Sequence, residues 1–184
     1  MHRSPDFQNL QYGPHQRNVL DLWLAKSAEP TPLVLYIHGG GFFRGDKASI
    51  SPDKVNAYLE AGISFAAINY RLTILNKAPA PAAYLDCGRA LQFLRHNAEQ
   101  WNFDSARVAS TGGSAGAGTS MYLAYHADLA DPENSDPIAR QSTKLTCIAV
   151  HNGQCSYDPR FAEQIGIPRP NLEAHQFFLP FYGI

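Results

Sequence analysis

Short apolar runs alternate with amphipathic segments along most of the chain. Apolar residues occupy nearly every position at 33–37 and 63–70, and such runs are typical of strands buried on both faces of a parallel sheet. The run at 145–150 predicts another short buried strand. Residues 107–111 predict one more strand. Within residues 18–26 the leucines fall on alternate positions, which predicts a strand with one buried face.

Segments with helical periodicity lie between these runs. Residues 52–61 follow Ser51, a residue type that caps helices, and end before Gly62. A stripe of apolar residues recurs at steps of three and four over 84–101, and a further helix is predicted over 115–127. Strands and helices therefore alternate, which predicts an α/β fold with a mostly parallel sheet and helices on both faces.

Composition narrows the class of protein. A length of 184 residues with 45% hydrophobic residues suits one domain with a substantial core. Lys and Arg total 15 against 16 Asp and Glu, so nothing favours nucleic acid or an anionic membrane as a partner. We find no apolar run of membrane-spanning length and no signal-peptide pattern in residues 1–14, and therefore expect a cytoplasmic location.

The cysteines predict thiols rather than cross-links. Their number is odd, and Cys87 and Cys147 fall in predicted core elements, whereas Cys155 follows the last predicted strand. We therefore expect buried free thiols and no disulfide. No phosphate-binding or dinucleotide-binding glycine pattern follows any of the predicted strands. We expect neither a cofactor nor a metal.

The stretch ASTGGSAGAG places Ser114 between Gly112 and Gly116, where a predicted strand meets a predicted helix. A serine at such a turn has a strained backbone, and its hydroxyl is exposed above the end of the sheet. Free N–H groups at the start of the helix favour negative charge at the same place, so the Ala115 N–H is a candidate oxyanion donor. This pattern predicts that Ser114 is a nucleophile.

A second motif offers further backbone donors. His38 directly follows a predicted strand and precedes Gly39, Gly40 and Gly41. Consecutive glycines allow bare backbone to approach a substrate carbonyl and turn its N–H groups toward it. We expect His38 to orient this glycine loop. Each motif alone is common, but the two together, each at the end of a buried strand, indicate a hydrolytic site.

The chain resembles the α/β-hydrolase carboxylesterases and lipases, of the hormone-sensitive-lipase-like or feruloyl-esterase-like branch. The segments HGGGFFRGD, INYRL and GGSAGAG carry the resemblance, which extends over about residues 18–155. It implies an α/β-hydrolase fold, Ser114 as nucleophile, and an oxyanion hole made by the N–H groups of Gly40, Gly41 and Ala115. It also implies a small-molecule carboxylic ester as substrate, cleaved through an acyl-serine intermediate.

Attack by Ser114 needs a base to take its proton and a carboxylate to orient that base. In the family these residues follow the serine, first Asp or Glu and then His, on loops after later strands. Here only one predicted strand follows Ser114. The chain offers His151, after that strand, and His175, in the tail, as candidates for the base. Neither has the place in the chain order expected of it.

The segment after His151 differs from the rest of the chain. Prolines interrupt it, and it ends in the aromatic stretch FFLPFYGI. Residues 156–184 resemble the insertion that lies over the active site in such esterases. They form either such an insertion or a tail. We therefore expect residues 1–184 to form a single, incomplete α/β-hydrolase domain that lacks the C-terminal strands, the Asp and the His of the full fold.

Two interpretations stay open. The first is a carboxylesterase represented by an incomplete chain that holds the nucleophile and the oxyanion hole. The second is a naturally short, non-catalytic α/β-hydrolase-like protein that binds a ligand or a partner, in which Ser114 remains as part of the scaffold. An acyltransferase or peptidase acting through the same serine is also compatible with these residues. The missing strands and the aromatic end favour the first interpretation.

Overall fold

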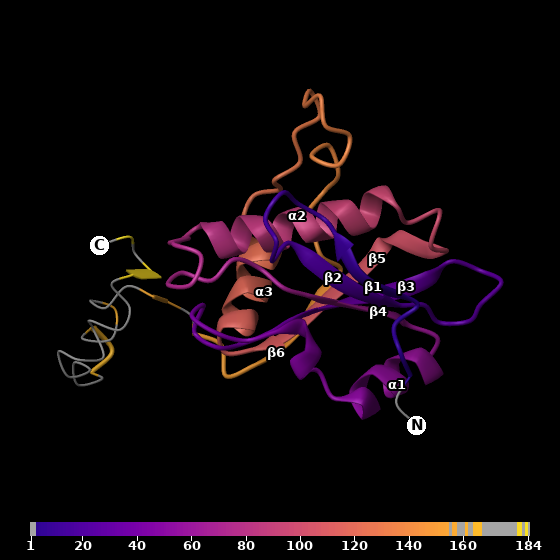
Figure 1. The fold of residues 1–184 in the computed structure, drawn as a ribbon, viewed down its shortest axis with the longest axis horizontal. Coiled ribbons are helices and arrows are strands. Elements are labelled where there is room, and N and C mark those ends of the chain that lie inside the picture. Colours follow the sequence, from indigo (N-terminus) through magenta and orange to yellow (C-terminus); the bar gives the residue numbers. More distant parts are fainter. Residues whose placement is uncertain are drawn as a thin grey trace.

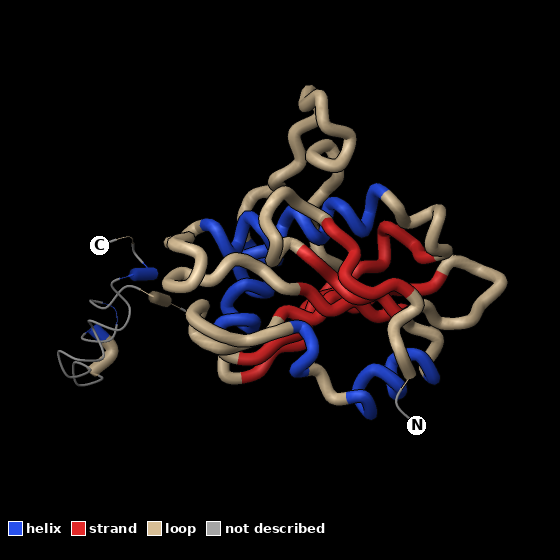
Figure 2. The backbone as a smooth tube through the Cα atoms, viewed as in Figure 1, coloured by secondary structure: helices blue, strands red, loops and turns tan. Residues whose placement is uncertain are grey.

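A six-stranded sheet lies at the centre of the molecule (Figure 1, Figure 2), with the strand order β1-β2-β4-β3-β5-β6. The computed structural model describes residues 3–154, 156–157, 161, 164–166, 180–181 and 183. The strands are β1 (Phe7–Gln11), β2 (Val19–Trp23), β3 (Thr31–Ile37), β4 (Ser64–Ile68), β5 (Phe103–Gly113) and β6 (Cys147–His151). The pairs β3–β4, β3–β5 and β5–β6 are parallel, whereas β1–β2 and β2–β4 are antiparallel. The predicted mostly parallel sheet is confirmed.

Helices cover both faces of the sheet, as predicted. On one face α1 (Pro52–Glu60) buries Val55 against β3 and β4. On the other face α2 (Ala82–His96) and α3 (Ala115–Tyr125) bury Leu91 and Leu123 against the core. Figure 1 shows α1 below the sheet and α2 above it, and a short 3-10 helix, η1 (Lys47–Ser49), precedes α1. Within the described part of the chain, none of the helices has the length and apolar character needed to cross a lipid bilayer.

Strand β1 has no counterpart in the elements predicted from the hydrophobic pattern. Its sequence, FQNLQ, is mostly polar, and its residues are exposed or half-buried. It forms by backbone pairing with β2 rather than by burial of an apolar face.

The predicted helix 84–101 ends earlier than expected, at His96. Ala98 and Trp101 nevertheless remain buried beyond its end, so the apolar stripe reports burial more reliably than helix length.

Strand β6 lies at the edge of the described sheet, and the prediction that it is a buried strand is wrong. Its residues alternate between exposed and half-buried, because α3 covers only one of its faces. The expected burial of Cys147 is wrong for the same reason, since this residue is exposed. Cys87 is fully buried, and burial raises the pKa of its thiol. Cys155 lies outside the described residues.

An apolar groove of about 400 Å³ lies beside α1, on the part of that face of the sheet that α1 leaves uncovered. Tyr58 and Ile63 line it on the side of α1, and Cys147 and Ala149 line it on the side of β6, with residues of β3 and β5 between them. Apolar sheet surface of this kind is normally covered by a second layer. In the described residues, the buried cluster beneath α1 includes residues of β2, β3 and β4, but no fully buried residue of β5 or β6.

A buried ion pair ties η1 to the sheet. Lys47 Nζ lies 2.6 Å from a carboxylate oxygen of Asp21 on β2, and the two side chains are 7% and 8% exposed. The same Asp21 side chain accepts a hydrogen bond from the Asn9 N–H at 2.8 Å. The Lys47 N–H donates to the Asn69 side chain at 2.7 Å. These contacts fix the segment that follows the glycine loop against β2 and the end of β4.

We expect Lys47→Met to lower the free energy of unfolding by about 3–5 kcal/mol, because it leaves the Asp21 carboxylate buried without a counter-charge. Urea denaturation measures this change. The double variant Asp21→Asn with Lys47→Met removes both charges and should recover most of the loss. Arg107→Met, which breaks the exposed pair with Asp104, serves as the control and should change stability far less. An equal loss in the single and double variants would contradict the prediction.

Candidate active site

Ser114 lies in a sharp turn between the last residue of β5 and the first residue of α3. Its backbone angles are φ 54° and ψ −121°. A positive φ is uncommon for a residue with a side chain, and it persists only where the surrounding structure imposes it. The strained strand–turn–helix geometry predicted for this serine is therefore present in the structure. It places Ser114 at the carboxyl edge of the parallel strands, where α/β proteins bind their ligands.

The turn depends on contact between backbones. A Cβ atom at Gly116 would overlap the carbonyl oxygen of Ile37 at the end of β3, and one at Gly112 would lie 2.6 Å from the same oxygen. Any side chain at these positions would therefore push α3 away from β3. The small residues that the motif supplies allow the helix to begin directly against the sheet.

The glycine loop touches the serine turn from the other side. A Cβ atom at Gly39 would lie 2.8 Å from the carbonyl oxygen of Gly113 and 3.6 Å from Cβ of Ser114. Gly40 has φ 113°, a conformation that residues with side chains rarely adopt. Among the described residues, no hydrogen bond uses the N–H of Gly40 or Gly41 as donor. The N–H of Ala115 begins α3 and so lacks a partner within the helix.

His38 lies beneath this loop and is 1% exposed. Its ring stacks on the ring of Tyr70, with the centroids 4.2 Å apart, and its Nδ1 lies 2.7 Å from the carbonyl oxygen of Gly39. Burial, reinforced by the Arg17 guanidinium, lowers the pKa of His38 to about 4 even though the bond to Gly39 opposes the shift. His38 is therefore neutral near pH 7. Its contacts suit a role in holding the glycine loop rather than in moving protons.

His151 ends β6 and is brought next to Ser114. Its carbonyl oxygen accepts a hydrogen bond from the Ser114 N–H at 3.1 Å. A Cβ atom at Gly113 would lie 2.8 Å from Cε1 of the His151 ring, so this ring packs over the turn. Within the described part of the chain, no hydrogen bond joins the Ser114 hydroxyl to His151. His175, the other candidate base, lies outside the described residues.

Ser114 opens into a pocket of about 420 Å³. The glycine loop, the serine turn and the end of β6 form one part of its wall, and the segment leading into α1 forms another. The residues described as lining it are Tyr36, Gly39, Ser49, Ile50, Ser51, Lys54, Gly113, Ser114, His151 and Asn152. None of these carries a carboxylate. Ser49, Ile50, Ser51 and Lys54 were not predicted as site residues, and they reach the pocket because α1 begins at the same edge of the sheet.

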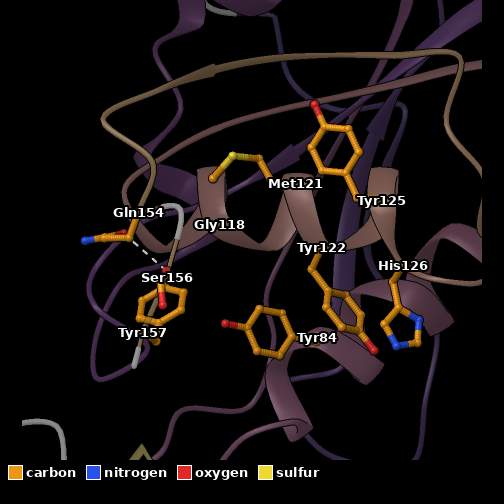
Figure 3. A pocket seen from close by; sticks show the side chains of 9 residues that line it. All are labelled: Tyr84, Gly118, Met121, Tyr122, Tyr125, His126, Gln154, Ser156 and Tyr157. Carbon is orange, nitrogen blue, oxygen red and sulfur yellow. Dashed lines mark hydrogen bonds between the residues drawn. The ribbon is translucent and has the colours of Figure 1, made fainter. Parts of the chain in front are cut away.

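A second hollow, of about 620 Å³, runs along the outer side of α3 (Figure 3). It begins at Gly118, one helical turn after Ser114, and extends to His126. Figure 3 shows the rings of Tyr84, Tyr122 and Tyr157 on one side of α3. The ring of His126 stacks on Tyr122 at 4.5 Å. His126 is thus at the far end of the helix from Ser114, in a packing role.

Part of the aromatic end of the chain docks near this hollow. The Phe181 ring lies 4.8 Å from that of Phe42, which is fully buried, and 5.3 Å from that of Tyr157. The Ala80 N–H donates to the carbonyl oxygen of Phe181 at 2.7 Å. Phe181 therefore continues the core that lies under the glycine loop.

Comparison with known proteins matches the chain with one family model and with several esterases. The family model described as BD-FAE matches residues 20–153. Esterase LipQ of Mycobacterium tuberculosis is 27% identical over 180 residues, which cover 94% of this chain and 38% of that protein. Carboxylesterase NlhH of the same organism is 26% identical over 161 residues, covering 87% of this chain and 47% of that protein.

Solved structures show the same likeness. The acetyl ester-xyloside bifunctional hydrolase from Caldicellulosiruptor lactoaceticus matches with a TM-score of 0.65 at 28% identity, covering 72% of this chain and 47% of that one. The butyrate-bound form of Est2, an esterase from Thermogutta terrifontis, matches with a TM-score of 0.69 at 17% identity, covering 89% and 58%. At this lower identity the likeness shows the fold alone. The chain spans between 38% and 58% of the length of these proteins.

Two glycines of α3 provide a matched test of the backbone contact. We expect Gly116→Ala to lower the free energy of unfolding by about 2–3 kcal/mol, because the new Cβ meets the rigid backbone of β3. In Gly118→Ala the new Cβ meets only the hydroxyl end of Tyr157, which can move. There the gain in helix propensity offsets the clash, and stability should change by less than about 1 kcal/mol. Urea denaturation of both variants checks this, and equal losses would contradict it.

Proposed function

The chain belongs to the BD-FAE family and has the α/β-hydrolase fold of carboxylesterases, and on this premise we propose that the protein hydrolyses carboxylic esters with Ser114 as nucleophile. The observation that carries the proposal is the strained backbone of Ser114, at φ 54° and ψ −121°. Strain of this kind is retained where it serves a site. It presents the Ser114 side chain to a pocket that the glycine loop also lines.

In the proposed reaction the Ser114 hydroxyl oxygen attacks the carbonyl carbon of the ester while a base takes its proton. The carbonyl π bond opens, and the tetrahedral intermediate carries its negative charge on the former carbonyl oxygen. The bond to the alcohol oxygen then breaks, and the alcohol leaves with the proton held by the base. Water repeats the same steps on the acyl-serine, which releases the carboxylic acid and restores Ser114.

We assign the stabilisation of the intermediate to backbone N–H groups of Gly40, Gly41 and Ala115. Their lack of hydrogen-bond partners among the described residues supports this role, because donors that are free in the resting site cost nothing to redirect. The Ala115 N–H also lies at the positive end of α3. A donor of this kind typically contributes a factor of about 10²–10³ to kcat.

We further propose that the base and the acid belong to a part of the protein beyond these residues. The curated relatives are about twice as long as the chain or longer. Among the described residues lining the pocket, His151 is the only histidine and there is no carboxylate. The exposed edge of β6 and the uncovered apolar groove beside it leave room for further strands and a covering layer. His151 is the alternative base within the described chain.

We expect the protein, expressed to its natural stop codon, to hydrolyse p-nitrophenyl acetate and to be labelled by a fluorophosphonate probe. Ser114→Ala should lower kcat by about 10⁴ or more and abolish labelling, because the covalent step is lost. Ser105→Ala, an exposed serine at the other end of β5, is the control and should keep both properties. Equal labelling of Ser114→Ala would refute the nucleophile. No labelling of the unchanged protein would favour the non-catalytic interpretation.

Reading the gene past codon 184 tests the assignment of the base and the acid. We expect an acidic residue and then a histidine, in that order, after further strands. The 184-residue chain alone should then hydrolyse the same ester at least about 10³-fold more slowly than the complete protein, because only the oxyanion hole and binding remain. A stop codon directly after residue 184, or equal rates that His151→Ala abolishes, would overturn this assignment.

A further inference from the structure

Arg17, which precedes β2, reaches under the glycine loop from a distant part of the chain. Its Nε donates to the carbonyl oxygen of Tyr70 at 2.8 Å, and its Nη2 donates to the carbonyl oxygen of Gly45 at 2.9 Å. The same Nη2 lies 3.5 Å from Nε2 of His38. The Arg17 side chain is 16% exposed. One guanidinium thus joins the end of β4, the end of the glycine loop and the His38 ring.

These contacts admit one form of the His38 ring. Nδ1 faces the carbonyl oxygen of Gly39, which only accepts hydrogen bonds, so Nδ1 carries a proton. Nε2 faces a guanidinium, which only donates, so Nε2 carries none. The ring is therefore the neutral tautomer protonated at Nδ1. The neutral tautomer protonated at Nε2 would present an N–H group to Arg17 and leave the Gly39 carbonyl without a donor. The doubly protonated ring would also present an N–H group to Arg17.

The tautomer sets the direction of the peptide group between Gly39 and Gly40. In a trans peptide the C=O of one residue and the N–H of the next point in opposite directions. The hydrogen bond from Nδ1 holds the Gly39 C=O toward the ring, so the Gly40 N–H points away from it. Gly45 permits this arrangement, because a Cβ atom there would overlap Nδ1 of His38.

We propose that Arg17 is a positioning residue for the oxyanion donors: by holding Nε2 of His38 as an acceptor, it fixes the ring tautomer that orients the Gly39–Gly40 peptide. This inference rests on the proposed function, because the peptide matters to catalysis only if the loop binds an oxyanion. Arg17 has no signal in the local sequence, and only the fold brings it to His38.

The charges around the ring favour the same form. Arg17 opposes protonation of His38, and Asp46, whose carboxylate lies 4.0 Å from Arg17, favours it. Tyr70, stacked on the ring, stays neutral because burial raises the pKa of its phenol. The nearby Lys47 ammonium forms its ion pair with Asp21. Burial, which is the largest influence, and Arg17 together outweigh the bond to Gly39 and the charge of Asp46, which gives His38 a pKa of about 4.

The ring nitrogens report the tautomer directly. In ¹⁵N-detected NMR spectra of the protein expressed to its natural stop codon, recorded at pH 7, we expect His38 to be protonated at Nδ1 only. In Arg17→Met, Nε2 loses its donor, so we expect a mixture of tautomers and a rise of the His38 pKa from about 4 toward 6.5. Arg107→Met, at the opposite end of β5, is the control and should leave the spectrum unchanged. An unchanged spectrum and pKa in Arg17→Met would overturn the proposal.

A kinetic cycle on the complete protein separates positioning from general support of the loop. We expect Arg17→Met to lower kcat for p-nitrophenyl acetate at least about tenfold with little change in KM, because the loss falls on the transition state. In a His38→Ala background the same substitution should have no further effect. An equal loss in both backgrounds would overturn the proposal. If the unchanged protein shows no Ser114-dependent labelling, the proposed function and the catalytic part of this inference both fail. The NMR experiment still decides the tautomer.

Discussion

Backbone contact between the end of β3 and the beginning of α3 is the constraint on which the candidate site depends. Gly116 lies against the carbonyl oxygen of Ile37, and Gly39 lies against that of Gly113. Side chains at these positions would hold the ends of β3 and β5 apart. Because they are absent, the glycine loop and Ser114 meet in one pocket, although β4 and α2 separate them in the chain.

Beneath this contact lies a layer of buried polar groups that are paired with one another. The Lys47 and Asp21 side chains form an ion pair, and Arg17 spans Tyr70, Gly45 and His38. Burial of unpaired polar groups is costly, so each of these contacts resists rearrangement. The loop is thereby held from below, while the N–H groups on its other side make no hydrogen bond to the described residues. A site that stabilises developing charge needs this combination of rigidity and free donors.

Prediction from the sequence succeeded where a structure is encoded in consecutive residues. The strand, turn and helix around Ser114 follow from an apolar run, small residues and a helical segment, and all three are present. It failed where burial depends on a neighbour. β6 reads as buried because its residues are apolar, yet it is an edge strand among the described residues. β1 gives no strand signal because it is polar, yet it pairs with β2 through its backbone.

The sequence by itself determined the α/β alternation, the strained turn at Ser114 and the glycine loop. Periodicity and the special backbone freedom of glycine act over a few residues, and so they can be read locally. The tertiary structure alone decided the exposure of Cys147, the docking of Phe181 on Phe42, and the contact of Arg17 with His38. Each of these is a contact, or the lack of one, between segments far apart in the chain. Such pairings depend on how the whole sheet and its helices pack, which no local pattern encodes.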